Sequence, residues 1–133
     1  MNKKFLGVSQ KLLPKEEGKA YWCTYRKQAA NVGDLILIYV KRVGISQLFE
    51  IIDVTVTNSM IQCDIRNMVT VWLKHIETYK SPLNASLMKS MDELKDFNAL
   101  RKNFQQTSFL ISEEYWDILM NIINSLNDKS NAN

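Results

Sequence analysis

The sequence predicts an α+β domain whose strands form a compact, strongly bent sheet or a small barrel. Before Pro82, apolar residues alternate with polar ones or fill whole short segments, a pattern typical of about five or six short strands. After Pro82 the apolar period changes to about 3.6 residues, which indicates helices. Strands with interspersed small helices favour an α+β fold built on one bent sheet.

The first strand is predicted at residues 4–10, and a polar loop follows at 12–18. Residues 24–30 are predicted to form a short helix, because Tyr25, Gln28 and Ala29 share one helical face. Gly33-Asp34 is expected to form a turn that opens the next strand. That strand, residues 35–40, is apolar at every position, so it should lie in the centre of the sheet with both faces covered.

Two longer segments complete the predicted sheet. Residues 47–57 form a strand in which Glu50 and Asp53 interrupt the apolar alternation, and such breaks often mark a β-bulge. Residues 60–76 alternate regularly, with a bend into two strands expected at Asn67. One face of this segment should belong to the core.

Helices are predicted in the last third of the chain. The first is expected to be capped by Asn84 or Ser86, because both side chains can accept a hydrogen bond from the first helical turn. A helical turn over 97–104 and an extended segment over 105–110 follow. Ser112 is expected to cap the last helix. The first helix carries Leu87, Met91 and Leu94, and the last helix has a predicted buried stripe of Tyr115, Ile118, Leu119, Ile122, Ile123 and Leu126.

The chain of 133 residues is the size of one domain, which we place at residues 1–126, followed by a polar tail at 127–133. Its two cysteines, Cys23 and Cys63, are fewer than a disulfide-stapled secreted domain usually carries, so we expect a reducing, cytoplasmic compartment. No apolar run approaches the roughly 20 residues of a membrane span, and the N-terminus lacks a signal-peptide pattern. We therefore expect no membrane partner.

The positive charge is concentrated in the first part of the chain. Lys3, Lys4, Lys11, Lys15, Lys19, Arg26, Lys27, Lys41 and Arg42 lie within residues 1–48, against Glu16, Glu17 and Asp34. A basic segment that also carries exposed aromatic residues suits a polyanion such as a nucleic acid. The alternative is a solvated surface that is basic without a ligand.

The residue types needed for catalysis or for a cofactor are scarce. His75 is the only histidine, so a Ser-His-Asp arrangement would depend on it alone. Cys23 and Cys63 do not form a CxxC pair, and one histidine with scattered acids makes a poor zinc set. The four glycines form no phosphate-binding or dinucleotide-binding pattern. We expect a binding module, not an enzyme, with no metal and no cofactor.

The order of several short motifs resembles that of the EVE domain, a member of the PUA-like superfamily that is close in fold to YTH domains. Trp22 is followed four residues later by Arg26, then by Gly33-Asp34 and by an apolar strand that ends in Tyr39. Further matches are Gly44-Ile45, Phe49-Glu50-Ile51, Pro82-Leu83, 101–108 and 111–116, so that the resemblance covers nearly the whole chain to residue 126. The resemblance implies a small bent PUA-like β-barrel of about five or six strands with flanking short helices and a C-terminal helix.

The resemblance also implies a class of ligand. Trp22-Cys23-Thr24 is similar to the Trp-Cys-Ser step of YTH domains, whose Trp forms one wall of a cage for methylated adenine. Residues 55–60, where a second cage Trp would fall, contain no aromatic residue, so N6-methyladenine is not the first ligand we expect. EVE domains are associated with modified cytosines in DNA and with prokaryotic, restriction-like defence. This implies a prokaryotic reader of 5-methylcytosine-type bases, with an effector protein such as a nuclease as a partner.

A reader of this kind needs an aromatic wall, polar groups for the base edge and cations for the phosphates. Trp22 is the predicted wall. The other predicted base-binding residues are Ser9, Gln10, Cys23, Thr24, Tyr39, Phe104 and Ser108. The predicted phosphate-binding residues are Lys11, Arg26, Lys27, Arg101 and Lys102.

Each of these residues also has a structural interpretation. Trp22 and Tyr39 could belong to the core, Arg26 could pair with Glu50, Trp72 could lie against the helices, and Trp116 could be core or rim. Two other functions stay open: a structural RNA binder that recognises shape and backbone without a modified base, and a protein-interaction domain. The sequence leaves open the choice between DNA and RNA, the base, and the oligomeric state.

Overall fold

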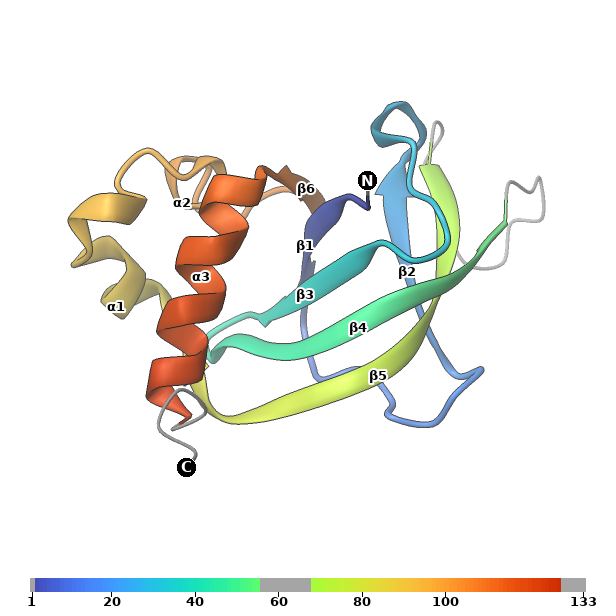
Figure 1. The fold of residues 1–133 in the computed structure, drawn as a ribbon, viewed down its shortest axis with the longest axis horizontal. Coiled ribbons are helices and arrows are strands. Elements are labelled where there is room, and N and C mark those ends of the chain that lie inside the picture. The colour runs from blue at the N-terminus through green and yellow to red at the C-terminus, as the bar shows by residue number, and fades with distance from the viewer. Residues whose placement is uncertain (1, 56–67, 128–133) are drawn as a thin grey trace.

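A computed structural model describes residues 2–55 and 68–127, and these form one curled, six-stranded sheet flanked by helices (Figure 1). The order of strands in the sheet is β2-β5-β4-β3-β1-β6. The strands are β1 (Lys4–Ser9), β2 (Ala20–Tyr25), β3 (Leu35–Val40), β4 (Gly44–Thr55), β5 (Met68–Leu83) and β6 (Ser108–Ile111). The α-helices are α1 (Ala85–Lys89), α2 (Asn98–Arg101) and α3 (Glu113–Leu126), with two short 3-10 turns, η1 (Arg26–Gln28) and η2 (Asp92–Leu94). The predicted bent sheet with flanking helices and a C-terminal helix is confirmed.

The sheet has an apolar cluster on each face, because side chains alternate along every strand. On β3, Ile36 and Ile38 belong to the cluster inside the curl, whereas Leu37 and Tyr39 belong to the cluster on the other side. Helix α3 covers this second cluster, as Figure 1 shows. The prediction that residues 35–40 form a central strand covered on both faces is therefore confirmed.

The short helix predicted at residues 24–30 is confirmed only at residues 26–28, which form a 3-10 helix, and its predicted start is wrong. Residues 20–25 form the edge strand β2, which pairs antiparallel with β5 from Ala20↔Leu73 to Tyr25↔Met68. Only the single 3-10 turn η1 follows, and it ends at Ala29, whose φ of 53° is left-handed. Pairing with a strand that lies far away in the sequence outweighs the weak local helical preference.

The two long strands β4 and β5 are strands as predicted, but their bounds differ from the predicted ones. Strand β4 begins at Gly44, and its pairing with β5 shifts register between Ile51 and Asp53, which confirms the predicted bulge at Asp53. Strand β5 continues past Ile76 as far as Leu83. The bend predicted at Asn67 lies outside the described residues.

Both predicted cap positions are occupied as expected. The backbone N–H of Leu87 donates to Asn84 Oδ1 over 2.8 Å, and that of Tyr115 donates to Ser112 Oγ over 3.3 Å. Helix α1 ends at Lys89, earlier than the stripe to Leu94 implied. The most buried residues of α3 are Trp116, Leu119 and Ile123, so Trp116 is a core residue.

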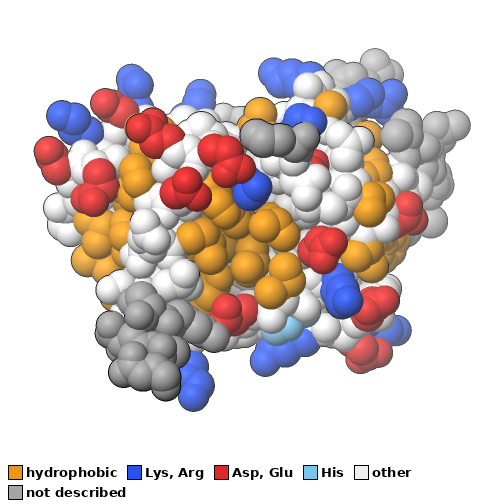
Figure 2. Space-filling model, in the orientation of Figure 1, with side chains coloured by type: hydrophobic (Ala, Val, Ile, Leu, Met, Phe, Trp, Pro, Cys, Tyr) orange, Lys and Arg blue, Asp and Glu red, His pale blue; other side chains and the backbone are white. Residues whose placement is uncertain are grey.

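The face that carries α3 is acidic at the start of that helix. Figure 2 shows acidic side chains gathered over the upper end of α3, where Glu113 and Glu114 occupy the first turn. This placement favours the helix, because its N-terminal end carries a partial positive charge. It also makes this end of the helix unsuited to a polyanion.

No helix within residues 2–55 and 68–127 is long and apolar enough to cross a membrane.

Candidate functional site

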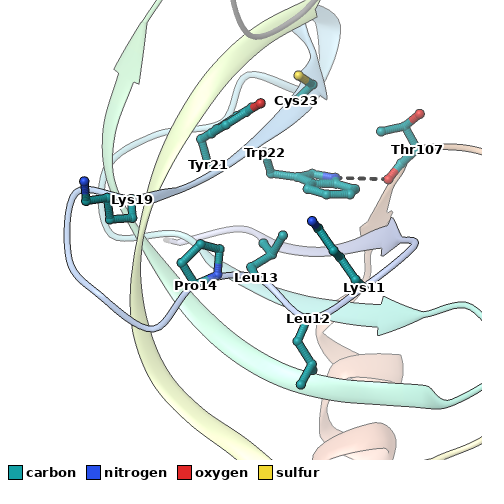
Figure 3. Close-up of a pocket in the computed structure, with 9 residues that line it drawn as sticks. All are labelled: Lys11, Leu12, Leu13, Pro14, Lys19, Tyr21, Trp22, Cys23 and Thr107. Carbon is teal, nitrogen blue, oxygen red and sulfur yellow. Dashed lines mark hydrogen bonds between the residues drawn. The ribbon is translucent and has the colours of Figure 1, made fainter.

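A pocket of about 380 Å³ lies between strand β2 and the loop that joins β1 to β2. Its lining residues are Lys11, Leu12, Leu13, Pro14, Lys19, Tyr21, Trp22, Cys23 and Thr107. Figure 3 shows Leu13 and Lys11 reaching toward the Trp22 ring, while Leu12 points away from it. The lining is mostly apolar, with one indole wall and two lysines, and it contains no acidic residue.

The indole of Trp22 bridges the two edges of the curled sheet. Its Nε1 donates a hydrogen bond to the backbone O of Thr107, just before β6, over 3.1 Å. The ring also lies against the backbone of Gly7 on β1, where a Cβ would stand only 2.6 Å from Trp22 Nε1. Gly7 therefore makes room for the indole, which is partly buried against the inner cluster and partly open to the pocket.

The loop opposite Trp22 is held by hydrogen bonds to buried side chains. Ser9 Oγ donates to the backbone O of Lys11 over 2.6 Å and accepts from its N–H over 3.2 Å. Gln47 on β4 is fully buried, and its side-chain amide binds both backbone groups of Leu13, an arrangement we call the Gln47 clasp. The N–H of Leu13 donates to Gln47 Oε1 over 2.8 Å, and Gln47 Nε2 donates to the backbone O of Leu13 over 3.0 Å. These bonds fix the apolar side of the pocket before any ligand arrives.

Tyr39 and Phe104 do not line the Trp22 pocket but a second pocket of about 550 Å³. It is lined by Tyr39, Lys41, Arg42, Ala85, Asn103, Phe104 and Gln105. The rings of Tyr39 and Phe104 stack with centroids 3.9 Å apart and planes 4° from parallel. Burial raises the pKa of the Tyr39 phenol above its ordinary value.

The other predicted base-binding residues line neither pocket. Ser9 is buried and engaged in its turn, and Gln10 is exposed after β1. Ser108 Oγ is buried and donates to Gln28 Oε1 over 3.4 Å. Thr24 Oγ1 is buried and has no hydrogen-bond partner among the residues that the structure describes. Of the predicted base-binding set, only Trp22 and Cys23 are brought together in the first pocket.

The predicted phosphate-binding residues lie in three places. Lys11 lines the Trp22 pocket. Arg26 and Lys27 are exposed on η1. Arg101 and Lys102 line a separate hollow of about 390 Å³ with Asn98.

Of the remaining residues of the Trp22 pocket, those of the loop between β1 and β2 were not predicted, whereas Thr107 lies in a segment, residues 105–108, whose contact with the pocket the sequence left open. Leu13, Pro14 and Lys19 lie in a loop that reads as an ordinary polar connection, and Thr107 is distant in the sequence. Two signals were present in the sequence: a glycine inside an apolar strand at Gly7, which often marks a close approach, and a glutamine inside an apolar strand at Gln47. Neither signal identifies its partner.

Trp72 and His75 line none of the three hollows described above. Trp72 is partly buried beside Tyr21, with ring centroids 5.5 Å apart, instead of within the helix-covered cluster. His75 Nε2 is 2.7 Å from Thr78 Oγ1, and burial, followed by the charge of Lys15, lowers the His75 pKa. Within the described residues, no three His, Cys, Asp or Glu side chains gather as a metal site.

Solved structures of the same fold come from bacteria and from humans. A protein of Rhodopseudomonas palustris, Rpa0253, matches with a TM-score of 0.67 and 19% identity over 95% of this chain and 93% of its own. Atu2648 of Agrobacterium tumefaciens matches with a TM-score of 0.67 and 17% identity, covering 86% of this chain and 88% of its own. The human THYN1 protein, in complex with DNA that contains 5-methylcytosine, matches with a TM-score of 0.67 and 14% identity over 91% of this chain and 97% of its own.

At these identities the structural matches establish the shared fold. Comparison with curated proteins gives no match. The model of the EVE domain family matches residues 5–122, which is most of the chain. This protein therefore belongs to the EVE domain family.

Proposed function

We propose that this EVE domain binds nucleic acid and reads a modified base, of the 5-methylcytosine type in DNA, by taking the flipped base into the Trp22 pocket. The observation that carries this proposal is the placement of Trp22. Its ring packs against the backbone of Gly7, its Nε1 donates a hydrogen bond to the backbone O of Thr107, and the ring also lines the pocket. A flat aromatic wall of this kind accepts the face of a nucleobase, and such stacking is worth about 1–3 kcal/mol.

The apolar side of the pocket supports a preference for a methylated base. Leu13 and Pro14 line the same pocket as the indole. A methyl group buried against them would gain about 0.8 kcal/mol, which corresponds to roughly fourfold in affinity. Larger selectivity would require polar contacts with the base edge, for which the pocket offers backbone groups of the loop and of β2.

The positive charge of the pocket lining and the structural similarity to THYN1 support nucleic acid as the partner. Lys11 and Lys19 line the pocket with no acidic residue among the lining. The human THYN1 protein, which shares this fold, has been solved in complex with 5-methylcytosine-containing DNA. We infer that the chain acts as a non-enzymatic module in a prokaryotic cytoplasm and that a separate effector, such as a nuclease, supplies any chemistry.

A second candidate function is RNA binding through shape and backbone alone. Arg26 and Lys27, and also Arg101 and Lys102, are exposed outside the Trp22 pocket, where they would contact phosphates without reading a base. Such binding depends on salt but not on base modification.

The test compares short DNA and RNA oligonucleotides, single- and double-stranded, with one central cytosine or adenine that is plain or methylated, at two salt concentrations. We expect selective binding to methylcytosine DNA and, for Trp22→Ala, a loss of about 5- to 160-fold in affinity, the equivalent of one stacked base. The matched control is Tyr115→Ala, which removes a half-buried aromatic ring on α3 that packs against the cluster on the other face of the sheet from Trp22. Equal binding of plain and methylated bases, unchanged in folded Trp22→Ala, would contradict the proposal and favour the RNA-binding alternative.

A further inference from the structure

The second pocket, of about 550 Å³, has the composition of an anion site. Lys41 and Arg42 lie on the turn between β3 and β4, and both are exposed. Across from them, Asn103 and Gln105 lie on the loop between α2 and β6. The lining contains two cations and two side-chain amides and no carboxylate, which is the donor set that a phosphate requires.

The floor of this pocket is rigid. Tyr39 and Phe104 stack on each other and are both buried. The Phe104 N–H donates to the backbone O of Ala99 over 2.9 Å, which ties the loop to α2. A preformed floor lowers the entropy cost of binding, because fewer groups must be ordered when the ligand arrives.

Backbone strain is concentrated at the same place. Four non-glycine residues in the described part of the chain have positive φ, and three of them line this pocket: Arg42 (70°), Asn103 (54°) and Phe104 (55°). Positive φ is unusual for a bulky residue such as phenylalanine. Strained residues cluster at ligand clamps, where the surrounding structure holds them in place.

The Trp22 pocket and the second pocket are connected through two backbone segments. The N–H of Lys41 donates to the backbone O of Ser9 over 2.9 Å, and the Ser9 side chain in turn bonds to Lys11 of the Trp22 pocket. On the other chain segment, Gln105 lines the second pocket and Thr107 lines the first. Two residues span at most about 7 Å of extended chain, so these two lining positions lie within a few base-pair steps, each of which rises roughly 3.4 Å along the axis of B-form DNA.

We propose that the pocket formed by Lys41, Arg42, Asn103 and Gln105 binds one backbone phosphate of the same strand whose base enters the Trp22 pocket, a few nucleotides from that base. This inference rests on the proposed nucleic-acid function and adds residues that set the register of the strand. Arg42 presents a planar fork that suits two phosphate oxygens, and Lys41 supplies a point charge. A phosphate contact positions the strand without reading its sequence.

The first test neutralises the two cations. The double variant Lys41→Gln/Arg42→Gln is compared with Lys74→Gln/Lys80→Gln, which removes the same charge from exposed positions on β5. We expect the pocket variant to bind methylated and plain duplexes about tenfold more weakly, by the same factor for each, since a hydrogen bond to a charged group is lost. The slope of log affinity against log salt should fall by about 0.9, the value for one phosphate.

The second test locates the phosphate. A series of duplexes carries a single neutral methylphosphonate at successive positions on either side of the methylated base. We expect the wild-type protein to lose affinity sharply at one position, and the Lys41→Gln/Arg42→Gln variant to be indifferent to that same position. The control variant should retain the wild-type profile.

The outcomes separate this inference from the proposed function. If base selectivity depends on Trp22 but the pocket variant behaves as the Lys74/Lys80 control does, the phosphate site is refuted and base reading stands. If Trp22→Ala changes nothing while the methylphosphonate profile depends on Lys41 and Arg42, base reading fails and the phosphate site stands. A uniform loss along the whole series would also refute a defined phosphate site, because it indicates general charge attraction.

Discussion

At the scale of single residues, Gly7 and Trp22 must be considered together. Trp22 lies on the edge strand β2, and Gly7 lies on β1, close to the opposite edge of the sheet. The indole crosses this seam only because Gly7 has no side chain. A residue without a side chain thus determines where the wall of the candidate pocket stands.

We predict that Gly7→Ala will displace the Trp22 ring. The new Cβ would be 2.6 Å from Trp22 Nε1 and 2.8 Å from Cε2, so the indole must move. Overpacking of this kind costs about 1–3 kcal/mol, measurable by chemical denaturation, and affinity for a methylated oligonucleotide should fall as well. In a Trp22→Ala background the same substitution should cost nothing, because the clash is gone; an equal cost in both backgrounds would contradict the inferred contact.

At the scale of elements, the loop between β1 and β2 is held in place by a side chain that belongs to another element. Its polar sequence, with Pro14 and Gly18, reads as an ordinary connection. The buried amide of Gln47 on β4 binds both backbone groups of Leu13 and thereby turns this loop into one side of the pocket. The function of the loop therefore depends on a strand more than thirty residues away.

We predict that Gln47→Met will free the loop while leaving the sheet intact. The variant keeps a similar side-chain volume but leaves the Leu13 N–H and O without their partners, at a cost of about 1–3 kcal/mol. Amide hydrogen exchange at Leu13 should accelerate, and base binding should weaken because the pocket must then be ordered on binding.

The matched control is Thr78→Val. It removes the hydroxyl that lies 3.4 Å from Gln47 Nε2 but leaves both bonds to Leu13 in place. Exchange at Leu13 should then stay slow. If Gln47→Met left exchange at Leu13 unchanged, the clasp would not be what orders the loop.

At the scale of the whole molecule, one sheet supports two apolar clusters. The strands β1, β3, β4 and β5 each contribute to both clusters, because their side chains alternate between the two faces. Neither cluster can lose its strands without disrupting the other. The described chain should therefore unfold as one cooperative unit.

We predict that core truncations on opposite faces will shift the same transition. Leu119→Ala removes a buried side chain of α3 from the helix-covered cluster, and Ile51→Ala removes one of β4 from the inner cluster. Each should lower the free energy of unfolding by about 2–5 kcal/mol. Tryptophan fluorescence and far-ultraviolet circular dichroism should report one coincident transition in both variants, whereas two separated transitions would show that the clusters unfold independently.

The fold was predictable from sequence where local chemistry decides it. The all-apolar run of residues 35–40 predicted a central strand, Asn84 and Ser112 predicted helix starts, and Asp53 predicted a bulge. The order of the short motifs predicted the EVE family, which the family model confirms. The role of Trp22 in base binding stays a prediction.

The candidate site was less predictable, because its parts meet through long-range contacts. The last two residues of strand β2, Thr24 and Tyr25, were assigned to a short helix, since the partner strand β5 lies far along the chain. Tyr39 and Phe104 were grouped with Trp22, but they stack on each other in a separate pocket.

By itself, the sequence determined the periodicity of each segment, the helix caps, the family and the excess of positive charge in residues 1–48. Only the tertiary structure decided that Gly7 makes room for Trp22, that Gln47 holds Leu13, and that Trp22 and Tyr39 line separate pockets where one was expected. The physical reason is that caps and periodicity depend on neighbouring residues, which the sequence shows directly. The curl of the sheet instead brings together residues whose separation along the chain carries no information about their contact.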